Sequence, residues 1–136
     1  MIRRPDWLAE LGRYLDAVRD RPFSWGQHDC ALFAAGAVAA MTGQEDIGGA
    51  WRGTYNGPDE ALAQLQAHGI ADHVDLVGRH LVELPRPLDA QVGDVVAVIE
   101  GNQLCLGICG GAVIHVAGPR GLGAVDLMRG VRAWRV

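Results

Sequence analysis

Hydrophobic side chains recur at helical spacing near the start of the chain. Between residues 6 and 20 they are Trp7, Leu8, Leu11, Tyr14, Leu15 and Val18. This stripe predicts an amphipathic helix over residues 6–20 that lies on a core. The Arg21-Pro22 step ends the helix, because a residue that precedes proline disfavours the helical conformation.

A second helix is predicted over residues 29–41, where the sequence is almost entirely apolar and rich in alanine. The small side chains permit close backbone approach, and Thr42-Gly43 supplies a glycine suited to the left-handed cap. The preceding aromatic residues Phe23 and Trp25 are predicted to pack over this helix.

Residues 44–57 are rich in glycine and polar groups, which indicates a loop, with Trp51 and Tyr55 as candidate anchors. Pro58 then opens a predicted third helix through residue 66, with Ala61, Leu62 and Leu65 facing inward.

After Gly69 the hydrophobic period becomes that of strands. An extended segment is predicted over residues 77–84, followed by a central strand at 95–99. Further strands are predicted at residues 104–109, 112–117 and 122–127, with an edge strand at 131–136. Helices followed by a run of strands predict one α+β domain over residues 1–136, with N-terminal helices packed on a C-terminal antiparallel β-meander.

Composition restricts the classes of function. The 136 residues are 49% hydrophobic and 21% charged, as in a soluble globular domain. The net charge of −4, without a block of like charges, does not favour a nucleic-acid or anionic-membrane partner. No apolar run is long enough for a membrane span, and no signal peptide is recognised, which predicts synthesis in a host cytoplasm. Three cysteines do not make a disulfide framework.

Cys30 is the first candidate for chemistry. It falls at the predicted start of the second helix, directly after His28 and Asp29. A thiol in that position feels the positive end of the helix dipole and unpaired backbone N–H groups, both of which favour the thiolate. Cys30 is therefore a candidate nucleophile.

A cysteine nucleophile needs a base, and five histidines are available. His68, His73 and His80 lie in a polar stretch and are predicted to face solvent. His28 could contact the thiol region, although capping or lining the turn is the simpler role. His115 lies inside an apolar strand, where a polar side chain needs a buried partner or a functional reason.

Other motifs in the chain are weaker candidates for a functional site. Cys105 and Cys109 share a face at strand spacing and could form a soft metal site with Cys30 or His115, but their spacing matches no known zinc knuckle. The glycines of residues 118–123 lie between strands and not at a helix start, so they do not make a phosphate loop. Asp94 at a strand start is expected to make a turn hydrogen bond. No cofactor and no metal are predicted.

Several short motifs together resemble one family. Asp29-Cys30 enters a helix, Val92-Gly93-Asp94-Val95-Val96 opens a sheet, and residues 104–109 and 112–117 follow as paired strands. In these features the chain resembles the NlpC-type cell-wall cysteine peptidases, which have a papain-like fold. Within that group it is similar to small tail-associated proteins of phages and gene-transfer agents. The resemblance covers residues 20–136.

The resemblance implies roles for individual residues. Cys30 matches the nucleophile of an Asp-Cys pair. The base histidine of the family begins a motif of the form His-Val-Gly-Ile, and the matching segment here is Cys105-Leu106-Gly107-Ile108. Ile114-His115-Val116 matches the motif of the third, orienting residue. The base position is therefore occupied by Cys105, and the implied site is degenerate.

A cysteine is a poor substitute for that histidine, since its usual pKa is about 8.5 against about 6.5. His115 or His28 could serve Cys30 instead. Two hypotheses follow. In the first, which we favour, the chain is a structural part of a phage tail tip, docked on hub proteins in the virion. In the second, it is an active tail-borne endopeptidase that cuts bacterial peptidoglycan with Cys30.

Overall fold

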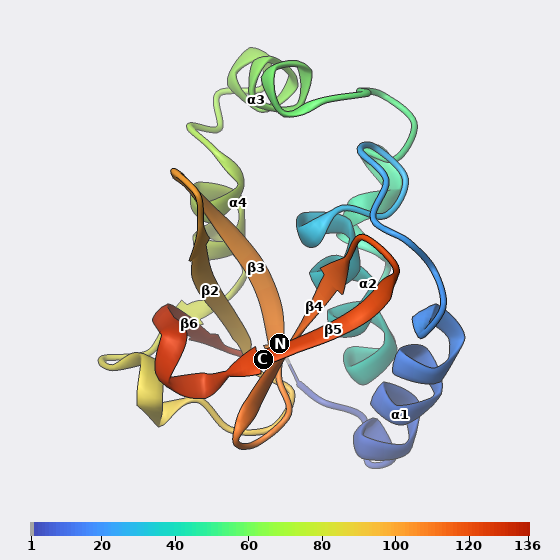
Figure 1. The fold of residues 1–136 in the computed structure, drawn as a ribbon, viewed down its shortest axis with the longest axis vertical. Coiled ribbons are helices and arrows are strands. Elements are labelled where there is room, and N and C mark those ends of the chain that lie inside the picture. Colours follow the sequence, from blue (N-terminus) through green and yellow to red (C-terminus); the bar gives the residue numbers. More distant parts are fainter. Residues whose placement is uncertain (1) are drawn as a thin grey trace.

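Helices come first and strands second in the chain, and they form an α+β arrangement (Figure 1). The computed structural model describes residues 2–136. Its helices are α1 (Trp7–Val18), α2 (Cys30–Thr42), α3 (Pro58–Ala67) and α4 (His73–His80). Its strands are β1 (Val82–Glu83), β2 (Val95–Glu100), β3 (Gln103–Cys109), β4 (Val113–Gly118), β5 (Gly121–Asp126) and β6 (Gly130–Arg135). Short 3₁₀ turns lie at Ile47–Ala50, Pro87–Asp89 and Leu127–Arg129. The predicted fold class is confirmed at this level.

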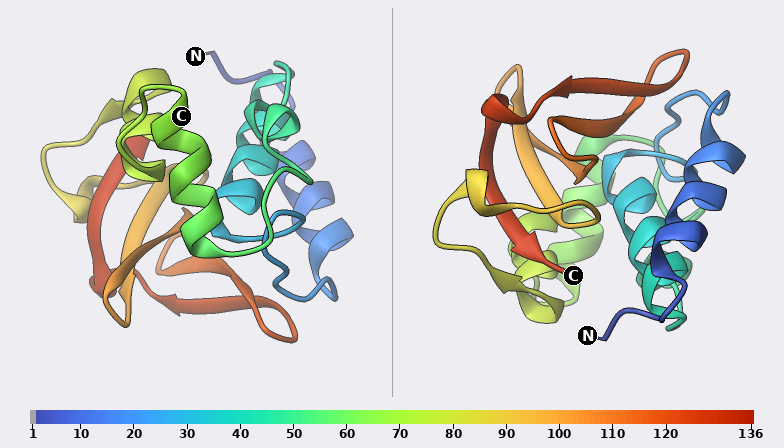
Figure 2. Two further views of the ribbon diagram at one scale, coloured as in Figure 1. Left: turned by 90° about the horizontal axis from the view of Figure 1, so that it is seen from above. Right: turned by 90° about the horizontal axis from the view of Figure 1, so that it is seen from below.

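The first two helices form a pair, and α2 lies between α1 and the sheet (Figure 2). The hydroxyl of Tyr14 on α1 donates to the backbone oxygen of Phe33 on α2 at 2.7 Å. The ring of Tyr14 occupies the space that a side chain at Gly36 would need, so the small residue allows the close approach. Gly43 ends α2 with φ +71°, which confirms the predicted left-handed cap.

The six strands form one antiparallel sheet in the order β1-β6-β2-β3-β4-β5. After the meander from β2 to β5, the chain returns so that β6 pairs with the other side of β2. The prediction of an edge strand for residues 131–136 is wrong, because β6 has β1 on its outer side. The two-residue length of β1 explains the error, since so short a partner leaves little pattern in the sequence. Trp134 on β6 is fully buried.

Strands β3 and β4 are neighbours over only a short distance. Their paired positions are Ile108 with His115 and Cys109 with Ile114. By contrast, β4 and β5 pair along their whole length, from Val113 opposite Asp126 to the turn after Gly118. The first half of β3 and the last half of β4 therefore separate, and this separation opens the sheet beside the start of α2.

Both faces of the sheet are buried. One face packs on α1 and α2 through residues that include Phe33, Val95, Leu106, Ile108 and Trp134. The other face carries a second hydrophobic cluster, which comprises Ala90, Val96, Val98, Cys109, Ile114 and Ala133. Strand β2, which contributes side chains to both clusters, is consequently apolar at successive positions from Val95 to Ile99.

Asp94 does more than the predicted turn hydrogen bond. Its fully buried carboxylate accepts the N–H of Gln91 at 2.9 Å, which is the expected turn contact. It also accepts the guanidinium groups of Arg3 at 2.9 Å and Arg135 at 3.2 Å, and the N–H of Val136 at 3.1 Å. The carboxylate therefore ties the first and last segments of the described chain to the start of β2.

The predicted extended segment over residues 77–84 is wrong in its first half. Helix α4 occupies residues 77–80, whereas Leu81 and β1 are extended. Val74, Val77 and Leu81 lie at i, i+3 and i+7 and pack on the core, and Asp72 caps the first turn. The β-branched valines suggested a strand, whereas their spacing is helical.

Helix α3 confirms the third predicted helix, but only part of its predicted inward face is correct. Leu65 is buried, whereas Leu62 is 42% exposed. Leu62 lies beside an open cleft and not against the core, which accounts for its exposure.

Candidate functional site

Cys30 is the first residue of α2, as predicted, and Asp29 is the N-cap. The Asp29 carboxylate accepts the N–H of Leu32 at 3.0 Å, which satisfies one of the backbone donors that a helix start leaves without a partner. The sequence Asp-Cys therefore fixes the thiol at the helix start, because the cap residue determines where the helix begins.

The same carboxylate joins two loops. Its second oxygen accepts the N–H of Gly26 at 3.1 Å and the hydroxyl of Tyr55 at 2.5 Å. Gly26 has φ +77°, and a side chain there would meet the backbone oxygen of Tyr55. The N–H of Gly53 donates to the oxygen of Gly26 at 2.8 Å. The turn before Cys30 and the loop around Tyr55 are thus held together through one buried acid.

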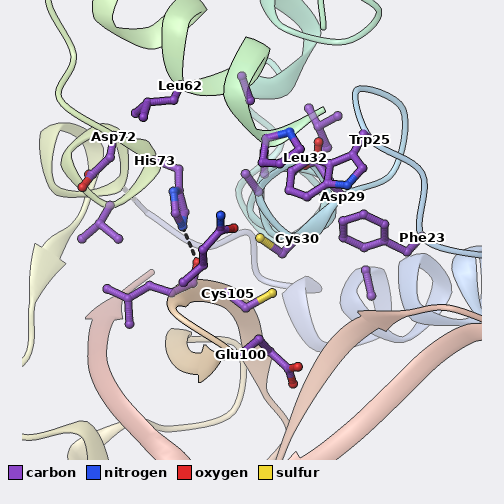
Figure 3. Close-up of a pocket in the computed structure, with 18 of the residues that line it drawn as sticks. Phe23, Trp25, Asp29, Cys30, Leu32, Leu62, Asp72, His73, Glu100 and Cys105 are labelled. Carbon is purple, nitrogen blue, oxygen red and sulfur yellow. Dashed lines mark hydrogen bonds between the residues drawn. The ribbon is translucent and has the colours of Figure 1, made fainter. Parts of the chain in front are cut away.

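Cys105 on β3 faces Cys30 on α2 (Figure 3). Each thiol is the largest single influence on the pKa of the other. Cys30 is buried and Cys105 is half-buried. The structure therefore brings together the two positions that the sequence assigned to nucleophile and base.

The ionisation of the pair differs from the expectation. The hydrogen bond with Cys105, followed by burial, raises the pKa of Cys30 well above its usual value. The hydrogen bond from Cys30 lowers the pKa of Cys105. The sequence predicted a thiolate at Cys30 because of the helix start. The thiol opposite and the loss of water act against that effect at Cys30, whereas Cys105 is the more exposed sulfur and its pKa is lowered.

A cleft of about 980 Å³ opens above the two thiols. Its walls come from the connector before α2, the loop that contains Trp51 and Tyr55, the helices α3 and α4, and the separated ends of β3, β4 and β5. The residues that line it include Phe23, Trp25, Cys30, Trp51, Tyr55, Leu62, His73, Leu104, Cys105 and Val116. Its volume is at the upper end of the range for small-molecule and peptide sites.

The comparison with protein families decides what the chain is related to. A family model described as a domain of unknown function (DUF6950) matches residues 2–136. The chain belongs to this family. Comparisons with curated proteins and with solved structures gave no match. No helix within residues 2–136 is long and apolar enough to cross a membrane.

The charged groups that line the cleft of this DUF6950 chain are all acidic. They are Asp29, Asp59, Asp72 and Glu100. None of the arginines within residues 2–136 lines the cleft. Asp29 is enclosed by its hydrogen bonds, whereas the other three are exposed at the rim. The cleft therefore combines an apolar, aromatic wall with a negative rim.

His73 is the histidine that lines the cleft, so its predicted solvent-facing position is wrong. Its Nε2 lies 2.6 Å from the backbone oxygen of Leu104, and the ring is half-buried (Figure 3). The contact holds α4 against the start of β3 and occupies the ring nitrogen. His68 and His80 are exposed, as predicted.

The other two candidate histidines lie away from the thiol pair. His28 is buried with its ring edge-on to Phe33, which fits the simpler prediction that it lines the turn. His115 faces Gly110 at the far end of β4 and is not among the residues that line the cleft. Burial lowers the pKa of both histidines. The structure does not bring an imidazole of either residue to Cys30.

The third cysteine is separate from the pair. Cys109 lies in the core on the second face of the sheet, and its thiol donates to the backbone oxygen of Gly111 at 3.6 Å. Cys105 lies on the same face of β3 and packs at the edge of this core, where it also lines the cleft, whereas Cys109 does not line the cleft. Within residues 2–136 no group of three His, Cys, Asp or Glu side chains is placed to hold a metal ion.

Tyr55 and His73 are the site residues that sequence reasoning missed. Tyr55 was expected only as a loop anchor, yet its hydroxyl completes the hydrogen bonds of Asp29. A single tyrosine in a loop rich in glycine was the available signal. For His73, the signal was its place directly after Asp72, a helix cap that had not been recognised.

Proposed function

We propose that this protein is a structural component of a phage tail tip, with an NlpC-like, papain-type fold whose peptidase site is degenerate. The observation that carries the proposal is the pair Cys30 and Cys105. The resemblance assigns the base to the position of Cys105, and this position is occupied by a thiol that faces Cys30.

The chemistry of the pair supports loss of catalysis. A cysteine peptidase needs a thiolate nucleophile and a group that carries its proton to the leaving amine. Here the pKa of Cys30 is raised, whereas that of the neighbouring Cys105 is lowered. Loss of one member of a catalytic triad typically lowers the rate by about 10⁴-fold.

The cleft supports a binding role in its place. Its aromatic wall and exposed acids Asp59, Asp72 and Glu100 are complementary to an extended segment that carries apolar and basic side chains. We propose that such a segment belongs to a hub protein of the tail. The virion is then the place of action after synthesis in the host.

The test is complementation in the phage or gene-transfer agent that encodes the chain. Deletion of the gene should give particles without a complete tail tip, and immunogold labelling should place the protein there. A Cys30→Ala gene should restore infective particles to the wild-type titre, as should the matched control Cys109→Ala. Failure of Cys30→Ala alone, with the protein incorporated into particles, would refute the structural role.

An active peptidoglycan endopeptidase is the second candidate, favoured by the open cleft directly over a cysteine at a helix start. In that case Cys30 attacks the peptide bond, and N–H groups of the first turn of α2 stabilise the oxyanion. Incubation with purified peptidoglycan should then release peptides, and Cys30→Ala should abolish the release. The structural proposal expects no release from either protein.

A further inference from the structure

The contact between Cys30 and Cys105 has chemistry of its own. The residues are far apart in sequence, yet their side chains face each other in the cleft, one from the start of α2 and one from β3 (Figure 3). A disulfide requires the sulfurs to approach to about 2.05 Å. Two thiols that face each other from neighbouring elements are placed to make that approach.

The pair is also open to a reagent. Both thiols line the cleft, and Cys105 is the more exposed of the two. Cys109 is fully buried and does not line the cleft. A small disulfide that enters the cleft therefore meets Cys105 first and Cys30 directly behind it.

We propose that Cys30 and Cys105 form a redox-active dithiol, which a small-molecule disulfide such as oxidised glutathione converts into an intramolecular disulfide. The Cys105 thiolate attacks one sulfur of the small disulfide, whose S–S bond breaks and releases one thiol. Cys30 then loses its proton to solvent, and its sulfur attacks Cys105 and releases the second thiol. Two protein thiols are oxidised, and one small disulfide is reduced to two thiols.

The electrostatics match this order of events. The hydrogen bond from Cys30 lowers the pKa of Cys105, and the thiolate is the attacking species. The raised pKa of Cys30 keeps it protonated until the mixed disulfide on Cys105 removes the neighbouring negative charge. Cys105 is thus the attacking sulfur and Cys30 the resolving one.

The experiment equilibrates the purified, folded chain with mixtures of reduced and oxidised glutathione, then blocks free thiols and maps the peptides by mass spectrometry without reduction. Wild type and Cys109→Ser should both give a peptide that joins Cys30 to Cys105. Cys30→Ser and Cys105→Ser should give only glutathione adducts. Circular dichroism checks that each variant is folded.

A second measurement does not depend on oxidation. Phenylarsine oxide binds two neighbouring thiols at once, so Cys109→Ser should bind it as tightly as wild type, and either serine variant of the pair should lose binding. The proposal is overturned if folded Cys109→Ser keeps both thiols free under all mixtures, or carries only glutathione adducts. The pairing is decided by wild type and Cys109→Ser, so the proposal can be refuted even if Cys30→Ser or Cys105→Ser does not fold. The result is also independent of any role in a tail.

Discussion

Replacing Asp29 by alanine tests the claim that one buried acid holds the site together. The substitution removes the acceptor for the N–H of Leu32, which as a lost helix cap costs about 1 kcal/mol. It also leaves the N–H of Gly26 and the hydroxyl of Tyr55 without their partner, at about 1–3 kcal/mol each when buried. We expect the free energy of unfolding to fall by about 4 kcal/mol.

Urea denaturation followed by circular dichroism measures this loss. Asp72→Ala is the matched control, because Asp72 is also a helix cap that accepts a backbone N–H, from Asp75 at 2.8 Å, but is exposed. It should cost about 1 kcal/mol. The reasoning is refuted if Asp29→Ala costs no more than Asp72→Ala.

The hydroxyl of Tyr55 can be isolated by a double-mutant cycle. Tyr55→Phe alone should cost about 1 kcal/mol, since Asp29 keeps its two backbone donors. In the Asp29→Ala background the same change should be nearly neutral, because the hydroxyl it removes is already without an acceptor. If the losses in the two single variants simply add in the double variant, the contact between Tyr55 and Asp29 does not contribute to stability.

Three further results are expected. Iodoacetamide at neutral pH should label Cys105 faster than Cys30, and faster labelling of Cys30 would contradict this expectation. Cys30→Ala should slow the labelling of Cys105, because the thiol that lowers the pKa of Cys105 is removed. Burial lowers the pKa of His28 and His115, so the unfolded chain binds more protons than the folded one. The free energy of unfolding should therefore be highest above about pH 6.5 and should fall as the pH decreases below that value. His28→Gln should flatten that decrease in urea titrations, and an unchanged slope would exclude its contribution. Asp94→Asn should lower the free energy of unfolding by about 3 kcal/mol in the same assay, since it removes the buried negative charge that pairs with two arginines. A loss below about 1 kcal/mol would show that hydration of the arginines replaces these ion pairs.

Secondary structure could be predicted from the sequence where the hydrophobic pattern and the local capping or turn residues indicate the same element. Helix α2 has an N-cap at Asp29, an apolar interior and a terminal glycine at 43, and each of these signals acts within a few residues. The strands β2 to β5 are likewise bounded by local turn residues. Their partners in the sheet follow from chain order, because successive strands of a meander pair with each other.

Non-local contacts explain the errors. The return of β6 to β2 pairs residues 32 to 39 positions apart, and β1 pairs with β6 across 51 to 53 positions, which no local pattern records. The pKa of Cys30 is set first by Cys105 on β3 and then by burial, and both depend on residues distant in sequence. The sequence could place Cys30 and Cys105 in one site only through the resemblance, and it could not show that His115 faces the other end of β4.

The joint contact of Asp94 with both ends of the described chain has a practical consequence. The guanidinium of Arg3 also donates to the backbone oxygen of Val136 at 3.0 Å, and the two ends lie side by side in every view (Figures 1 and 2). A short peptide could therefore join them, and new termini could be opened at the exposed hairpin tip between Gly101 and Asn102. Such a circular permutant would keep the ion-pair cluster while β2 and β3 came from opposite ends of the chain.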